Sequence, residues 1–135
     1  MKNVISTNKA PAALGAYSQG IRAGDFIFVS GQLPLNPETG KVEGATIGEQ
    51  TVRTLENLKA ILEASGASLK DVVKVTVILS DTADFKPMNE VYKSYFSEPF
   101  PARVAYGGKL ALPSLLVEID AIAYVGQSQQ MVVDK

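Results

Sequence analysis

The sequence contains no cysteine, no histidine and no tryptophan among its 135 residues. Without cysteine the chain cannot form disulfides, thiolate nucleophiles, iron–sulfur clusters or cysteine zinc sites. Without histidine it cannot build Ser-His-Asp or Cys-His machinery, and it lacks the one side chain that titrates near neutral pH when unperturbed. Any catalysis must therefore use Arg, Glu, Asp, Tyr, Ser or Lys side chains with backbone groups and water.

The chain also lacks an excess of charge of either sign, with 13 basic and 14 acidic residues. Nucleic-acid-binding proteins usually carry a basic excess or a Lys/Arg stripe, so we expect no nucleic-acid partner. The longest apolar run free of Lys and Arg, residues 110–117, contains Pro113 and is far too short to span a bilayer. The first residues do not resemble a signal peptide. We therefore expect no membrane partner and a cytoplasmic location.

The length suits one domain, which we place at residues 1–126. With 46% apolar residues the domain needs no disulfide or metal to fold. The polar stretch that begins at Gly126 predicts a flexible C-terminal tail over residues 127–135. Residues 131–133 could instead add a short strand.

Two helices are predicted. The first begins at a capping box formed by Thr46 and Glu49 and ends at Gly66. The second covers residues 85–96, with Thr82 or Asp84 as its cap and a proline in its first turn. Their apolar stripes, spaced three and four residues apart, are expected to face a core. The stripes comprise Val52, Leu55, Leu58, Ile61 and Leu62 in the first helix and Phe85, Met88, Tyr92 and Tyr95 in the second.

Strand patterns surround the helices. Residues 4–7 predict a short strand, and residues 21–23 and 26–30 flank a Gly-Asp turn and predict a hairpin. Residues 72–79 are rich in branched side chains and predict a central strand covered on both faces. Residues 103–106 predict another strand, and residues 117–124 alternate between two faces. This order predicts an α+β fold with a mixed sheet and both helices on one of its faces.

Four positions could carry chemistry. Ser30 and Gly31 end a strand and offer a hydroxyl and bare amides to an anion, or form an ordinary turn. Tyr17 could donate to a ligand or pack its ring. Arg103, two residues after a proline, could grip a carboxylate with two hydrogen bonds or be a solvated surface charge. Glu118 could hold a water in a cleft or simply face solvent. The Gly107-Gly108 pair lacks the context of a phosphate loop and is discounted.

These segments, taken in order, resemble the RidA/YjgF family of reactive-intermediate (enamine/imine) deaminases. The resemblance covers almost the whole chain. It is carried by Asn8-Lys9-Ala10-Pro11-Ala12-Ala13, Tyr17-Ser18-Gln19-Gly20, Ser30-Gly31-Gln32-Leu33-Pro34-Leu35-Asn36-Pro37, Gln50-Thr51, Leu55-Glu56-Asn57-Leu58-Lys59-Ala60-Ile61-Leu62, Met88-Asn89-Glu90-Val91-Tyr92, Pro101-Ala102-Arg103 and Val117-Glu118-Ile119.

The resemblance implies a chorismate-mutase-like (bacillus type) fold and a homotrimer with clefts between subunits. It implies hydrolysis of 2-aminoacrylate or 2-aminocrotonate, which pyridoxal-phosphate-dependent Ser/Thr dehydratases release, to a 2-oxo acid and ammonia, with no metal or cofactor. Arg103 would clamp the carboxylate, and Glu118 would hold the attacking water and move protons. The resemblance assigns ligand orientation to Tyr17, Ser30, Gly31, Asn89 and Ala105.

Three departures from the family pattern affect the expectation. Many members have Gly-Pro-Tyr where this chain has Gly15-Ala16-Tyr17, and many bacterial members have Cys where Ala105 stands. Residues 107–113 also differ, which leaves substrate preference open. The spacing from Arg103 to Glu118 is kept, so the two groups are expected to meet. The alternative functions are a trimeric binding module for small carboxylates or 2-oxo acids and, with less support, a translation inhibitor or ribonuclease.

Overall fold

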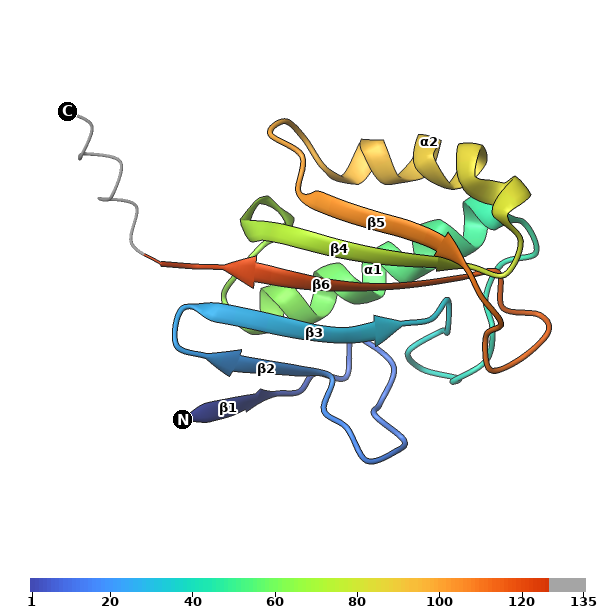
Figure 1. Cartoon of the computed structure of the whole chain (residues 1–135). Helices are drawn as coiled ribbons and strands as arrows, with labels where there is room; N and C mark the ends of the chain where they lie inside the picture. The colour runs from blue at the N-terminus through green and yellow to red at the C-terminus, as the bar shows by residue number, and fades with distance from the viewer. Residues whose placement is uncertain (127–135) are drawn as a thin grey trace.

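The computed structural model describes residues 1–126, so the predicted tail and its optional strand lie outside the described residues. Six strands and two α-helices make up the fold (Figure 1). The strands are β1 (Lys2–Ile5), β2 (Gly20–Ala23), β3 (Phe26–Gln32), β4 (Val72–Leu79), β5 (Ala102–Gly107) and β6 (Val117–Tyr124). The helices are α1 (Ile47–Ala64) and α2 (Phe85–Tyr95), with short 3-10 turns η1 (Leu69–Asp71) and η2 (Thr82–Asp84).

The strands form one mixed sheet in the order β1-β2-β3-β6-β4-β5. All neighbours are antiparallel except β4 and β5, which are parallel and are connected through η2 and α2. The predicted hairpin is confirmed as β2 and β3, and Gly24 in its turn has a φ of 61°, in the left-handed region that favours glycine. The predicted α+β fold with a mixed sheet is confirmed.

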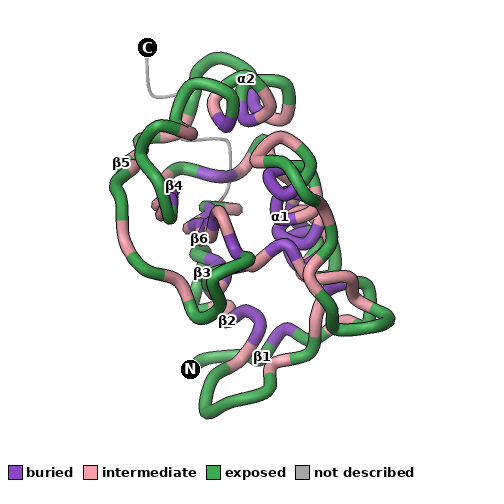
Figure 2. The backbone as a smooth tube through the Cα atoms, turned by 90° about the vertical axis from the view of Figure 1, so that its right-hand side faces the viewer, coloured by how far each residue is buried: buried purple, intermediate pink, exposed green. Residues whose placement is uncertain are grey.

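Both helices lie on the same side of the sheet (Figures 1 and 2). Helix α1 lies against β3 and β6, and α2 lies beside α1. The buried residues of the two helices meet the buried side chains of the strands in one core, coloured purple in Figure 2. We call the helix side of the sheet the covered face and the other side the open face. No helix in residues 1–126 is both long and apolar enough to cross a membrane.

The ends of α1 follow the prediction. The Thr46 side chain accepts from the Glu49 amide, and the Glu49 carboxylate accepts from the Thr46 amide, which completes the capping box. The chain leaves the helix through Gly66, whose φ is 88°. Helix α2 has Asp84 at its N-cap, but that side chain makes no capping bond; the Asp81 carboxylate instead accepts from the Ala83 amide in the preceding turn.

Three details of the prediction are wrong. The first strand covers Lys2–Ile5 rather than residues 4–7, because the Gln19 side chain binds both backbone polar groups of Thr7. Val52 is 41% exposed, since α1 points polar side chains such as Thr54 and Asn57 toward the core. Phe85 is also 41% exposed, and only Met88 and Tyr92 of the α2 stripe are buried.

Strand β4, predicted as central and covered on both faces, lies next to the edge strand β5, and this chain covers only one of its faces, so this prediction is wrong. Its burial alternates, with Val75, Val77 and Leu79 buried and the residues between them partly exposed. The open face carries large apolar side chains at 36–49% exposure. They are Phe26, Phe28, Val73, Val104, Tyr106 and Tyr124. An apolar surface of this kind on a sheet is typical of an interaction site.

Candidate functional site

Arg103 and Glu118 lie on opposite faces of the sheet. In the strand register Arg103 stands beside Val75, and Glu118 stands beside Ile78. Residues opposite one another on neighbouring strands share a face, and successive residues along a strand alternate. Val75 and Ile78 are three positions apart, so their partners face opposite ways. Within one chain the two groups that were expected to meet are therefore separated by the sheet.

Arg103 is held on the covered face by three side chains of α2. Its Nη1 donates to Asn89 Oδ1 at 2.7 Å. Its guanidinium carbon lies 4.6 Å from the ring centre of Tyr92 and 5.3 Å from that of Phe85, within the range of cation–π contacts. Burial raises the pKa of the Tyr92 phenol, and the nearby Arg103 charge partly opposes this. The positive charge of Arg103 thus sits against two aromatic rings and an amide.

A cavity of about 420 Å³ opens beside Arg103. Its other lining residues come from α2 and from the segment that leads into β5: Asn89, Tyr92, Lys93, Phe100 and Pro101. The Lys93 ammonium is paired with Glu90 at 3.1 Å, whereas Arg103 has no carboxylate partner among residues 1–126. Ala105 follows on the same face of β5, beside Val77. This cavity therefore offers an uncompensated guanidinium and mainly apolar walls.

Glu118 lies on the open face against the end of β3. The β3–β6 register shifts between Val29 and Gln32, a bulge that inserts Ser30 and Gly31 into the pairing. A Cβ atom at Gly31 would overlap the Glu118 carboxylate, so only glycine lets this carboxylate lie against the strand. Ser30 is fixed beside it, since its hydroxyl donates to the Ser18 carbonyl and its amide donates to the Gln19 carbonyl.

Glu118 is half-buried, and burial raises the pKa of its carboxyl group above the ordinary value. The Asp120 carboxylate, two residues along the same face of β6, raises it further. Asp120 itself is anchored, because its Oδ1 accepts from the Thr76 amide at 3.2 Å. Glu118 has no ion-pair partner within the described chain. A carboxylate of this kind can exchange protons closer to neutral pH than an exposed one.

Tyr17 lies apart from both groups, in the loop between β1 and β2, and is 55% exposed. The loop is held by the buried Gln19 side chain, which donates to the carbonyls of Thr7 and Pro11 at 3.0 and 2.7 Å and accepts from the Thr7 amide. Tyr17 and Ser18 line a shallow hollow with β1. The loop thus connects Tyr17 to Ser30 through Ser18.

The structure therefore gathers the predicted residues into two groups. We call Arg103, Asn89 and Ala105 the arginine group; it lies on the covered face at β5 and α2. We call Glu118, Gly31 and Ser30 the glutamate group; it lies on the open face at β3 and β6. In residues 1–126 no three His, Cys, Asp or Glu side chains come together as a metal-binding group.

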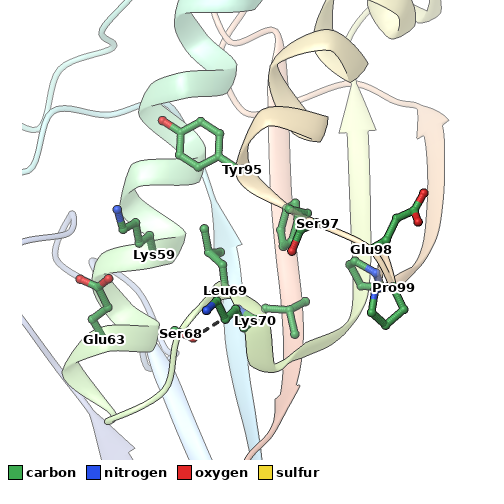
Figure 3. A pocket seen from close by; sticks show the side chains of 12 residues that line it. Lys59, Glu63, Ser68, Leu69, Lys70, Tyr95, Ser97, Glu98 and Pro99 are labelled. Carbon is green, nitrogen blue, oxygen red and sulfur yellow. Dashed lines mark hydrogen bonds between the residues drawn. The ribbon is translucent and has the colours of Figure 1, made fainter.

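A separate cavity of about 590 Å³ lies between the second half of α1, η1 and the segment after α2 (Figure 3). Lys59 and Glu63 reach toward it from α1, and Tyr95 from α2. The Tyr95 hydroxyl donates to Glu56 Oε2 at 2.7 Å, and burial together with this bond raises its pKa to about 12. None of the predicted site residues lines this cavity, so the sequence did not predict a site here.

Sequence reasoning missed the residues that support the two groups. Phe85 and Tyr92 were predicted as core residues, yet both contact the Arg103 guanidinium. Phe85 and Tyr92 are four and three residues from Asn89, so all three side chains lie on one face of α2. This spacing could have indicated from the sequence that both rings lie near the site of Asn89. Gln19 and Asp120 gave no such signal, because their partners are backbone groups distant in sequence.

Comparison with known proteins gives consistent similarities. Residues 7–125 match the family model described as endoribonuclease L-PSP. A RutC family protein of Pyrococcus abyssi is 57% identical over 123 residues, which cover 91% of this chain and 97% of that protein. A Rattus norvegicus protein named 2-iminobutanoate/2-iminopropanoate deaminase is 44% identical over 126 residues, which cover 93% of this chain and 92% of that protein.

The fold is also similar to solved structures. The crystal structure of E. coli TdcF with bound serine matches with a TM-score of 0.85 and 39% sequence identity. The match covers 92% of this chain and 99% of that one. The relatives therefore agree on the architecture, and their names range from a generic family title to a specific deaminase.

Proposed function

The chain belongs to the endoribonuclease L-PSP family, the RidA/YjgF family that its motifs resemble, and from this premise we propose that it is a cofactor-free deaminase of 2-imino acids. The naming of mammalian relatives as imine deaminases supports this activity at moderate identity. The observation that carries the proposal is the guanidinium of Arg103, which is fixed by Asn89, opens on a cavity and has no carboxylate partner in the described chain. Such a group is suited to bind the carboxylate of a small acid.

The chemistry asked of the site is modest. Water adds to the electrophilic C2 of the imine as one of its protons passes to the nitrogen, which gives a carbinolamine. The hydroxyl proton of this intermediate then passes to the nitrogen as the C2–N bond breaks, which releases ammonia and the 2-oxo acid. Glu118 carries the proton in each of these two transfers from oxygen to nitrogen. Its raised pKa suits both steps, because the carboxylate must accept a proton and then give it up. Arg103 holds the substrate carboxylate so that C2 faces the water.

We infer that the two groups meet between copies of the chain. Arg103 and Glu118 are on opposite faces and each lacks an ion-pair partner in residues 1–126, so one chain cannot bring them to the same substrate. The apolar open face supplies a surface on which a second copy can pack. A chorismate-mutase-like homotrimer, with the open faces inward and three clefts, satisfies both requirements. Tyr17, Ser30 and Gly31 then orient the ligand from the side of the glutamate group.

The substrate would be supplied by enzymes that release 2-aminoacrylate or 2-aminocrotonate, such as the pyridoxal-phosphate-dependent Ser/Thr dehydratases. A cytoplasmic location fits this link. The substrate side chain would lie against the apolar wall of Phe100 and Pro101, which favours short aliphatic groups over charged ones.

The test couples the purified protein to a threonine dehydratase and follows 2-oxobutanoate in a buffer that slows spontaneous imine hydrolysis. The proposal expects faster formation with the wild-type protein and a loss of about 10- to 100-fold with Arg103→Ala, since a charge-assisted contact is removed. No acceleration by the wild-type protein would reject the enzyme and favour a binding module. Full activity of Arg103→Ala would reject the site assignment.

The description of the family model raises ribonuclease activity as a second candidate. The net charge of −1 and the absence of histidine give that candidate little support. Incubation with a labelled single-stranded RNA, with Arg103→Ala and Glu118→Gln beside the wild-type protein, tests it directly. Cleavage that both variants abolish would favour the ribonuclease over the deaminase.

A further inference from the structure

Helix α2 presents three side chains to Arg103 at regular spacing. Phe85, Asn89 and Tyr92 are four and three residues apart and so lie on one face of the helix. Residues seven positions apart are separated by about 10 Å along a helix axis. The guanidinium carbon lies 5.3 Å from the Phe85 ring centre and 4.6 Å from the Tyr92 ring centre, so it sits between the two rings.

Phe85 is not part of the buried core. It is 41% exposed, at the first residue of α2. Tyr92, by contrast, is 4% exposed and packs on Phe96 with ring centres 4.6 Å apart. The Phe85 ring thus contacts Arg103 without belonging to the core, whereas the Tyr92 ring serves the core as well.

The hydrogen bonds of Arg103 leave one edge of the guanidinium available. Nη1 donates to Asn89, the Tyr92 hydroxyl lies close enough to interact with the guanidinium, and no carboxylate within residues 1–126 pairs with Arg103. Aromatic rings attract a guanidinium through its face, whereas a carboxylate binds in its plane through two N–H groups. A guanidinium placed between two rings thus keeps the edge that a carboxylate needs.

We propose that Phe85 is a positioning residue, which together with Tyr92 brackets Arg103 and orders its guanidinium before the substrate carboxylate arrives. The proposal rests on the proposed function of Arg103 as the carboxylate clamp. A free arginine side chain loses considerable rotamer entropy when it binds a ligand in one geometry. An arginine held between two rings has already lost this entropy, so that substrate binding and substrate orientation both improve.

The experiment compares Phe85→Leu, which keeps apolar bulk but removes the π face, with Phe85→Trp, which restores a π face. Val52→Ala is the control, because Val52 is equally exposed and lies on the other helix, α1. We expect Phe85→Leu to raise KM and lower kcat/KM by about 3- to 30-fold, the range of a cation–π contact. Phe85→Trp should recover most of the loss, and the thermal midpoint of Phe85→Leu should match that of Val52→Ala.

A second readout does not depend on catalysis. The Nε–H resonance of Arg103, identified by its loss in Arg103→Lys, should be sharp and shifted by the ring currents in the wild-type protein and in Phe85→Trp. It should move to an averaged position in Phe85→Leu. If the wild-type protein shows no deaminase activity, this measurement still tests the bracket while the proposed function fails.

Two results would overturn the inference. One is an Arg103 resonance that is the same in the wild-type protein and Phe85→Leu, together with unchanged kcat/KM where activity is present. The other is an equal loss in Phe85→Leu and Phe85→Trp accompanied by a lowered thermal midpoint, which would make Phe85 a purely structural residue.

Discussion

The covered face and the open face of the sheet hold their polar groups in different ways. On the covered face, Arg103 is surrounded by side chains of α2 from the same chain, and the core beneath it is complete. On the open face, Glu118 lies half-buried against Gly31, and neither of the helices in residues 1–126 covers this side of the sheet (Figure 2). The arginine group is thus completed within one chain, whereas under the proposed function a second copy completes the glutamate group. This difference leads to predictions that separate catalysis, geometry and stability.

Glu118→Gln should have the largest effect, because it removes the proton carrier on the open face and keeps its shape. We expect kcat to fall about 100-fold. This is at the low end of the rate contribution of a general acid–base group, because the imine is already reactive. KM should change little, because Arg103 binds the carboxylate. Steady-state kinetics of the coupled reaction measure both values. The exposed Glu38→Gln serves as the control, and a comparable loss in that variant would refute the role of Glu118.

Gly31→Ala should have the next largest effect. The new Cβ overlaps the Glu118 carboxylate, which must move away from β3. We expect kcat/KM to fall about 10- to 100-fold, as small misplacements of a reacting group can cost this much. Gly48→Ala on α1 is the matched control, since a Cβ there meets only ordinary contacts at 3.9 Å. Equal kinetics in the two variants would contradict the close fit of Glu118 to the bulge.

Asp120→Asn should shift the pH dependence. The negative charge of Asp120 raises the pKa of Glu118, so its removal lowers that pKa. Because Glu118 must be ionised to accept a proton from water, the rise of kcat/KM with pH should move to lower pH. Lys74 on β4 and Tyr106 on β5 share the open face and are unchanged by the substitution. A profile of kcat/KM between pH 4 and 8 measures the shift. If the rise of kcat/KM stayed at the same pH or moved to higher pH, Asp120 would not raise the pKa of Glu118.

Thr46→Ala should have the smallest effect on activity. It removes one half of the capping box of α1, on the covered face and away from both groups. We expect the free energy of unfolding to fall by about 1 kcal/mol while kcat/KM stays at the wild-type value. Urea unfolding followed by circular dichroism at fixed protein concentration measures the first quantity. A loss of activity without a loss of stability would show that the covered face is less independent of the site than proposed.

The sequence predicted the elements whose signals are local. The capping box at Thr46, the Gly24 turn and the alternation of β6 each involve residues close together in the chain, and all three are confirmed. The wrong details depend on distant partners. Residues 6 and 7 leave β1 because Gln19 binds Thr7, and no local pattern shows that bond.

For the candidate site, too, local signals could be predicted from the sequence and distant contacts could not. The residues that resemble the family motifs could be named from sequence, but their placement could not. Whether Arg103 and Glu118 share a face depends on the registers of β5 and β6 on β4, which are set by tertiary packing rather than by the 15-residue spacing between them. The Phe85 contact was missed because an apolar helix residue is read as core, and its partner lies on another element.

The most direct test of the shared site combines the two impaired variants. Arg103→Ala and Glu118→Gln, carrying different affinity tags, are co-expressed and the mixed oligomers are purified through both tags. If each site takes its arginine from one chain and its glutamate from the next, every mixed trimer selected through both tags has both groups intact in one of its three sites, which is about a third of all sites. The account predicts that about this fraction of wild-type activity returns. Mixed oligomers as inactive as either variant alone would contradict a site shared between chains.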